Sequence, residues 1–129
     1  MPPISDIDRP PGPAPTLGVL LISGGGERAH YAFVIATAAA AIGRDVTLFA
    51  TNDGCHALRA VLPYAGPAAP GVATLAELRD AAVELGVRRM VCDAGLRMAG
   101  LDLAALAPGV VVAGVPSFLA AAPGQVITI

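Results

Sequence analysis

Short apolar segments alternate with helix-forming segments along most of this chain, and this alternation restricts the fold more than any other feature. The first apolar segment, Leu17 to Ser23, is continuous rather than alternately polar, which is typical of a strand buried on both faces of a parallel sheet. Four later segments are also predicted as strands: Asp45 to Thr51, Val87 to Cys92, Val110 to Ala113 and Gln125 to Ile129. The alternation predicts an α/β fold with an open, mostly parallel five-stranded sheet and helices on both faces.

The segments between these strands carry helix signals. Glu27 to Ile42 is rich in alanine and ends at Gly43, a residue type suited to the left-handed position after a helix. Thr74 and Glu77 form a capping box at the start of an amphipathic helix. Shorter helices are predicted at Cys55 to Leu62, Asp102 to Pro108 and Pro116 to Ala122. Pro63 to Val72, rich in Pro, Gly and Ala, has no regular pattern and is a candidate flap.

Charge is scarce in this chain. Charged residues make up 14% of the 129 residues and hydrophobic residues 55%, against about 25% charged in an average protein. Such a chain either enters a membrane or buries surface against other copies of itself. Its apolar runs fall well short of the roughly 18 residues that a membrane span needs, so we expect no membrane span and a homo-oligomer. Glu27 to Ile42 is apolar nearly all round, and a neighbouring subunit is the simplest cover for its outer face.

The first residues, Met1 to Thr16, contain six prolines and no hydrophobic periodicity. We therefore expect a flexible tail at residues 1–16 and one α/β domain at residues 17–129. The tail lacks the basic start and apolar stretch of a signal peptide, which favours a cytoplasmic protein. The net charge of -2, with no basic cluster, makes nucleic acid an unsuitable partner.

The two cysteines, Cys55 and Cys92, are too few for a disulfide framework and are expected to be free thiols. Ligands of parallel α/β sheets gather beyond the carboxyl ends of the strands. Three loops are expected there: Ser23 to Gly26, Asn52 to Cys55 and Cys92 to Gly95. Asp53 and His56 lie near the cysteines but without the regular spacing of metal ligands, so we expect neither a metal nor another cofactor.

Cys92 ends a predicted strand and is followed by the small segment Asp93 to Gly95, which leaves the sulfur accessible. If a helical turn begins there, its backbone N–H groups favour a thiolate. Asp93 disfavours a thiolate, and Arg97 in the next turn can compensate. On residue type and position, a reactive thiol and a small buried side chain both remain open.

A glycine-rich loop follows the first strand. It consists of Ser23, Gly24, Gly25 and Gly26. With Ala29 it forms a Gly-x-Gly-x-x-Ala pattern typical of dinucleotide sites, and Asp53 is a candidate ribose partner. Glu27, however, would compete with a pyrophosphate for the same helix end, so a tight turn is the competing interpretation. We interpret His30, in the first turn, as a polar cap residue rather than a base.

Several segments over residues 17–129 share their order and spacing with a known family. After the first strand these are Glu27 to Ala36, Asp45 to Gly54, Leu75 to Val87, Val91 to Leu101 and Gly114 to Leu119. In them the chain resembles the DsrE/DsrF-like family of small sulfur-relay proteins. The resemblance implies a parallel α/β unit that forms trimers or hexamers, with a persulfide-carrying cysteine at Cys92. Gly95 departs from the serine that many relatives carry, and Asp93 adds a negative charge.

The resemblance implies a protein that accepts and donates sulfane sulfur on Cys92, with donor and acceptor proteins or small thiols as partners. Two other functions stay open: a non-catalytic oligomeric binding or scaffold module, and a nucleotide-binding protein that uses Gly24 to Gly26. Whether the chain is an enzyme is therefore open too. Besides Cys92, the candidate binding residues are Ser23, Gly24, Gly25, Asp53, Cys55 and Gly95.

Overall fold

The computed structural model describes residues 15–129, so the expected flexible tail lies outside the described residues except for its last two. These two residues are hydrogen-bonded to the body of the protein. Arg44 Nε donates to the Pro15 carbonyl oxygen at 3.0 Å, and the Gly124 N–H donates to Thr16 Oγ1 at 2.8 Å. Pro15 and Thr16 are therefore held in place, and Thr16 lies beside the turn that precedes the last strand.

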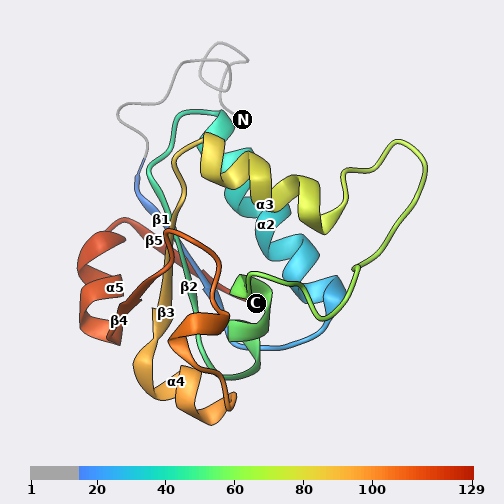
Figure 1. The fold of residues 1–129 in the computed structure, drawn as a ribbon. Coiled ribbons are helices and arrows are strands. Elements are labelled where there is room, and N and C mark those ends of the chain that lie inside the picture. The colour runs from blue at the N-terminus through green and yellow to red at the C-terminus, as the bar shows by residue number, and fades with distance from the viewer. Residues whose placement is uncertain (1–14) are drawn as a thin grey trace, which may run out of the picture.

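A five-stranded sheet forms the centre of the molecule, and all its pairings are parallel (Figure 1). Its strands are β1 (Leu17–Leu21), β2 (Val46–Ala50), β3 (Arg88–Cys92), β4 (Val111–Ala113) and β5 (Gln125–Thr128). Their spatial order is β4-β3-β2-β1-β5. The chain thus steps outward from β1 to β4 and then crosses back to add β5 beside β1. The predicted α/β class and five strands are confirmed, with the sheet parallel throughout.

The return crossover decides which helix covers which face. Helices α2 (Gly26–Ala41) and α3 (Leu75–Glu84) pack side by side on one face, whereas α5 (Val115–Ala121) lies on the other (Figure 1). Parallel crossovers are right-handed, so reversing direction along the sheet moves the connecting helix to the opposite face. Helix α4 (Asp93–Met98) directly follows β3 at the carboxyl edge. One face therefore carries two long helices and the other a single short one.

Alternate strand residues pack into two separate clusters. Under α2 and α3 lies the larger cluster, which includes Val19, Leu21 and Leu48. Phe49 and Phe118 form the core of the smaller cluster on the α5 face. Because apolar burial is the main source of folding free energy, the α2 and α3 face contributes most to stability.

Helix α2 is covered largely by its own chain. Helix α3 packs along it, and the buried residues of α2 include Ala29, Ala32, Phe33, Ala36 and Ala39. Tyr31 and Ile42 remain exposed, at 58% and 77%. A neighbouring subunit was expected as the simplest cover for the outer face of this helix, and the adjacent amphipathic helix α3 supplies much of that cover within the chain.

The predicted capping box of α3 is confirmed. The Glu77 N–H donates to Thr74 Oγ1 at 3.1 Å, and the Thr74 N–H donates to Glu77 Oε1 at 3.1 Å. These two bonds satisfy backbone groups that would otherwise lack partners at the helix start. They fix where the irregular segment 63–74 ends and α3 begins.

Two short helices differ from prediction. The 3-10 helix η1 (Asn52–Leu58) replaces the predicted turn and helix at Cys55 to Leu62, and the 3-10 helix η2 (Leu103–Ala105) replaces the predicted helix at Asp102 to Pro108. Gly54 explains the first difference, since a Cβ there would collide with the Leu21 carbonyl oxygen. The chain is drawn tightly against β1, a tertiary contact that local sequence patterns do not record.

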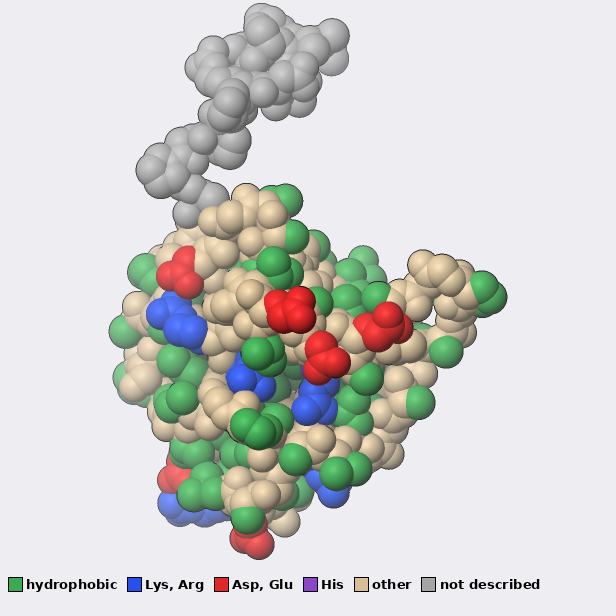
Figure 2. Space-filling view, turned by 45° about the horizontal axis from the view of Figure 1, so that its top comes forward, with side chains coloured by type: hydrophobic (Ala, Val, Ile, Leu, Met, Phe, Trp, Pro, Cys, Tyr) green, Lys and Arg blue, Asp and Glu red, His purple; other side chains and the backbone are tan. Residues whose placement is uncertain are grey.

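The surface carries few charges. On the face seen in Figure 2, acidic and basic side chains are interspersed and hydrophobic side chains lie exposed between them. Within residues 15–129, none of the helices has the length and apolar character needed to cross a bilayer. The exposed apolar area is therefore spread over the surface of a sheet-and-helix domain, not gathered into a membrane helix.

Candidate functional site

The loops after β1, β2 and β3 meet at the carboxyl edge of the sheet, as parallel strands require. A Cβ added to Gly24 would lie 3.0 Å from the Cβ of Asp53. An open depression of about 450 Å³ lies between the loops and is lined by Ile22, Ser23, Gly24, Asn52, Asp53 and Met98. The structure thus brings three candidate residues, Ser23, Gly24 and Asp53, to one place.

Backbone contacts fix the corner between β2 and η1. Asn52 adopts a left-handed conformation with φ of 51°, which is uncommon outside glycine and turns the chain sharply. The Gly54 N–H lies 3.1 Å from the Ile22 carbonyl oxygen and 3.0 Å from that of Thr51. This corner therefore has a set position against the end of β1.

Cys92 is the last residue of β3 and immediately precedes α4. Its backbone is extended (φ -71°, ψ 127°), and its side chain makes no capping hydrogen bond to α4. The thiol is free and partly exposed, and Cys92 packs against the cluster of Phe49, Phe118 and Ala122 on the α5 face. It lies where that face meets the carboxyl edge of the sheet.

Phe118 anchors α5 on the sheet face that carries this thiol. Its ring stacks on that of Phe49, with centroids 4.7 Å apart and planes 18° apart. A Cβ on Gly18 would lie 2.7 Å from the Phe118 ring, so the missing side chain in β1 makes room for it. Val115 and Leu119 remain about half exposed. One short helix, fixed mainly by one aromatic side chain, covers this face.

The carboxylate that follows Cys92 is paired with a cation. Arg97 Nη2 lies 2.6 Å from Asp93 Oδ2, one helical turn away. Both side chains are exposed, so this pair adds little to stability. The pair places a positive charge beside the carboxylate that follows Cys92.

Gly95 is buried where α4 meets the corner after β2. A Cβ there would collide with Thr51 Oγ1 and lie 2.6 Å from the Asn52 backbone nitrogen. The serine that many relatives carry therefore does not fit unless α4 or the corner moves. In this chain Gly95 serves close packing between two loops of the edge.

The second cysteine lies inside the core. Cys55 is 0% exposed and belongs to the cluster under α2 and α3, whereas Cys92 packs in the opposite cluster. Burial raises the pKa of Cys55 from its ordinary 9.0 to about 12, and a charge on Cys92 contributes in the same direction. Since the thiolate is the nucleophilic form, Cys55 is poorly suited to react at neutral pH.

The glycine-rich loop is open at Gly25 and packed against backbone at Gly26. Gly25, with φ of 99°, precedes α2. A Cβ on Gly26 would lie 2.8 Å from the Gly66 Cα, so the irregular segment 63–74 covers the first turn of the helix. Glu27 in this turn and Asp53 beside the loop are both acidic. Two carboxylates here oppose the binding of a pyrophosphate.

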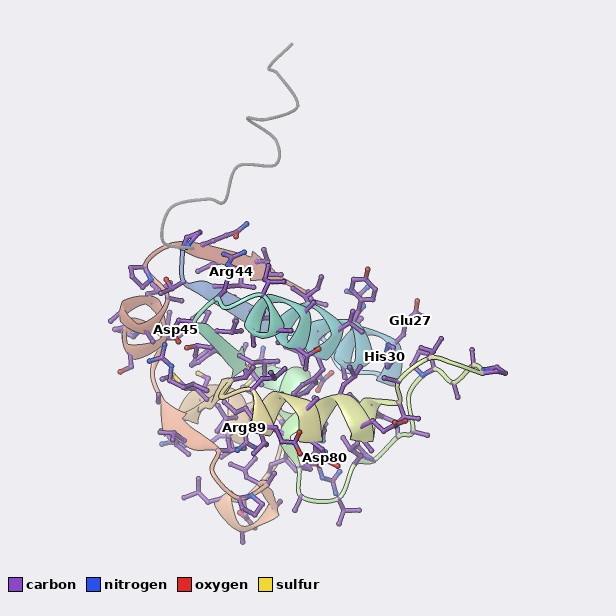
Figure 3. All side chains as sticks on the ribbon, turned by 90° about the horizontal axis from the view of Figure 1, so that it is seen from above. Glu27, His30, Arg44, Asp45, Asp80 and Arg89 are labelled. Carbon is purple, nitrogen blue, oxygen red and sulfur yellow. The ribbon has the colours of Figure 1, made fainter. Side chains whose placement is uncertain are left out.

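His30 holds the irregular segment to α2. Its Nε2 donates to the Ala73 carbonyl oxygen at 2.9 Å, and the side chain is buried; Figure 3 shows it near the start of the helix, facing that segment. The interpretation of His30 as a cap residue is therefore corrected. It fastens the chain one residue before the capping box of α3.

The residues considered as metal ligands are dispersed. Cys55 lies in the core, Cys92 on the α5 face and Asp53 in the loop beside Gly24. In the part of the chain that the structure describes, no three His, Cys, Asp or Glu side chains are grouped to hold a metal ion.

Sequence reasoning missed two residues that shape this edge. Phe118 had a signal in Gly18, since an isolated glycine in a strand often marks a close approach. Met98 is 76% exposed and lines the depression. No sequence pattern indicated Met98, because its location depends on α4 starting directly after Cys92.

Comparisons with solved structures agree with this architecture. The crystal structure of the ychN protein from E. coli matches with a TM-score of 0.67 and 15% identity, over 90% of this chain and 100% of that one. The protein of unknown function MTH1491 from Methanobacterium thermoautotrophicum matches with a TM-score of 0.61 and 18% identity, over 88% of this chain and 99% of that one. At these identities the likeness shows a shared fold.

Sequence comparison gives the family. No functionally curated protein is similar enough in sequence to match. The sequence profile of the DsrE/DsrF-like family matches residues 18–125, which contain both cysteines, all but the first residue of β1, every helix of the described residues and the start of β5. The chain therefore belongs to the DsrE/DsrF-like family.

Proposed function

We propose that this protein is a cytoplasmic sulfur-relay protein that carries sulfane sulfur as a persulfide on Cys92. The observation that carries the proposal is a partly exposed, unpaired thiol at the carboxyl end of β3 in a DsrE/DsrF-like fold. This edge is where parallel α/β sheets bind their ligands. A reducing compartment suits the proposal, because it keeps the thiol free between transfers.

The proposed transfer consists of two exchanges without net oxidation. The Cys92 thiolate attacks the outer sulfur of a donor persulfide, a new S–S bond forms, and the donor leaves as a thiolate. An acceptor thiolate then attacks the terminal sulfur on Cys92, and the Cys92 thiolate leaves. With thiosulfate and a rhodanese as the source, the rhodanese persulfide is the donor. Donors and acceptors are proteins or small thiols.

The surroundings of Cys92 support this chemistry. The Phe49–Phe118 pair gives Cys92 an apolar wall on one side, which limits access of stray thiols to a persulfide. On the other side Arg97 offsets the charge of Asp93. Cys55 takes no part in the proposed relay, because it is buried and its pKa is about 12.

We also propose that the protein works as a trimer or hexamer, with the α5 face in the interface. The exposed apolar residues of this face are Ile22, Val111, Val115, Leu119 and Val126. The proposal rests on their exposure on one face, where a neighbouring subunit would bury them. A neighbouring subunit there would cover the partly exposed thiol of Cys92.

Intact-mass analysis tests the relay. After incubation with polysulfide, or with thiosulfate and a rhodanese, the wild type should gain the mass of one sulfur and lose it again on treatment with a thiol. Cys92→Ala should gain nothing, and the matched variant Cys55→Ala should gain as much as the wild type. A wild type without the gain, or equal loading of Cys92→Ala, contradicts the relay. If Cys92 of the native protein also resists iodoacetamide, the scaffold alternative is favoured instead.

Analytical ultracentrifugation tests the assembly. We expect a trimer or hexamer at micromolar concentration, dissociated by Leu119→Asp on α5 and retained in the matched variant Ile42→Asp at the end of α2. Both positions are exposed in the single chain, at 52% and 77%, so neither substitution disturbs the core. A monomeric wild type contradicts the proposed assembly, and dissociation by Ile42→Asp alone contradicts the choice of face.

A further inference from the structure

Two arginines face one hollow beside α3, away from the thiol. Arg79 of α3 and Arg89 of β3 line a hollow of about 280 Å³ together with Asp80 and Pro108. Asp80 belongs to α3 and Arg89 to the strand β3 (Figure 3). Arg89 precedes Cys92 by three residues of β3, about 10 Å along a strand, and its side chain leaves the opposite face. This hollow is thus separate from the proposed relay site.

The guanidinium groups have few partners for their N–H donors. Arg79 Nη2 donates to the Arg59 carbonyl oxygen at 2.7 Å, and Arg89 Nη2 donates to the Pro108 carbonyl oxygen at 2.9 Å. The Arg89 Nε is buried without any acceptor. Among residues 15–129, neither guanidinium has a carboxylate oxygen within 4.0 Å. Donors of both groups therefore remain available to a ligand.

The two positive charges destabilise each other. Burial lowers the pKa of both Arg79 and Arg89, and the charge of Arg89 lowers the pKa of Arg79 further. The carboxylate of Asp80 acts in the opposite direction on Arg79 but does not reach ion-pair distance. A partly buried pair of like charges with an unsatisfied N–H is unfavourable unless an anion joins it.

The backbone makes room for this arrangement. A Cβ on Gly109 would lie 2.6 Å from Arg89 Nη2, so the glycine before β4 leaves space for the guanidinium. The hollow is large enough for a tetrahedral anion and several waters, each of which occupies about 30 Å³. Planar guanidinium donors suit the paired oxygens of phosphate and sulfate.

We propose that this hollow is a binding site for a phosphate-type or sulfate-type oxyanion, held between Arg79 and Arg89. Asp80 at the rim weakens binding by repelling the anion. The anion is either free or the phosphoryl group of a monoester, since both present the same oxygens.

Titration with inorganic phosphate at constant ionic strength tests this site, with binding measured by calorimetry and by the shift in Tm. The wild type should bind saturably, and its Tm should rise with occupancy. Arg89→Met and Arg79→Met should each weaken binding about tenfold or more. Arg28→Met, which removes the same charge from an exposed arginine, should bind like the wild type, and Asp80→Asn should bind several-fold more tightly.

The affinity for AMP tells the two forms of the anion apart. If AMP binds more tightly than inorganic phosphate, the ligand is a monoester. If AMP binds equally or less tightly, the ligand is the free anion. If phosphate has no more effect than chloride, the proposed site is wrong. The proposal is also contradicted if Arg28→Met and Arg89→Met weaken phosphate binding equally, or if Asp80→Asn leaves phosphate binding unchanged.

Discussion

The two faces of the sheet differ in how completely they are covered, and each holds one of the two cysteines. Beneath α2 and α3, Cys55 is sealed in the larger cluster. On the other face a single short helix leaves Cys92 partly exposed beside uncovered apolar residues. The difference shows how one topology produces an inert and an accessible thiol within a single domain.

The largest expected effect concerns the anchor of the thinly covered face. Phe118→Ala should lower the free energy of unfolding by about 3–5 kcal/mol, as for other buried phenylalanines, because it empties the space above Gly18 and ends the stacking on Phe49. Urea denaturation measures this loss. An exposed residue outside the proposed interface gives the control, since Ile42→Ala at the end of α2, where the side chain is 77% exposed, should change stability by about 0.5 kcal/mol or less. Equal losses for the two variants would contradict the anchoring role.

A smaller effect is expected at the edge between the faces. Gly95→Ser should lower stability by about 1–3 kcal/mol, because the new side chain meets Thr51 and Asn52. The matched substitution Ala94→Ser, at an exposed position of the same helix, should lower it by about 0.5 kcal/mol or less. The two midpoints in urea provide the comparison, and a harmless Gly95→Ser would show that α4 is not packed as described.

The smallest expected effect is a pH dependence of the free energy of unfolding, which comes from Cys55 beneath α2 and α3. The pKa of Cys55 is raised from 9.0 to about 12 in the folded protein, so the unfolded chain releases this proton first as the pH rises. The stabilisation is present below pH 9 and is lost progressively between pH 9 and 12, by about 1–2 kcal/mol at pH 10.

Unfolding free energies at pH 7 and pH 10 test this dependence. The wild type and Cys92→Ala should lose more stability at pH 10 than Cys55→Ala, which lacks the buried thiol. Equal losses in all three proteins would mean that the Cys55 thiol is not held in its protonated form by the fold.

Much of the fold can be predicted from sequence because it is encoded locally. Three patterns each depend on only a few neighbouring residues: the continuous apolar run at Leu17, the capping box at Thr74 and the glycine after α2. The structure has the corresponding elements. The strand at Arg88–Cys92 was expected to end at Cys92, as it does. The sequence of elements therefore follows from short patterns.

The remainder depends on contacts between distant segments. The strand order places α5 alone on one face, and no local pattern records that choice. Gly54 tightens η1 through its approach to Leu21, and α3 covers α2 through a contact between helices. For the site, the position of Cys92 on its strand was predictable, but its face and its exposure follow from the crossover before β5.

Peptide mapping of the sulfur-loaded wild type tests the central claim most directly. The protein is incubated with polysulfide, persulfides are trapped by alkylation under native conditions, and the cysteine-containing peptides are analysed by mass spectrometry. We expect the added sulfur on the Cys92 peptide and an unmodified thiol on the Cys55 peptide until the protein is unfolded. Sulfur on Cys55 in the native protein, or equal amounts on both, would contradict the contrast between the two faces.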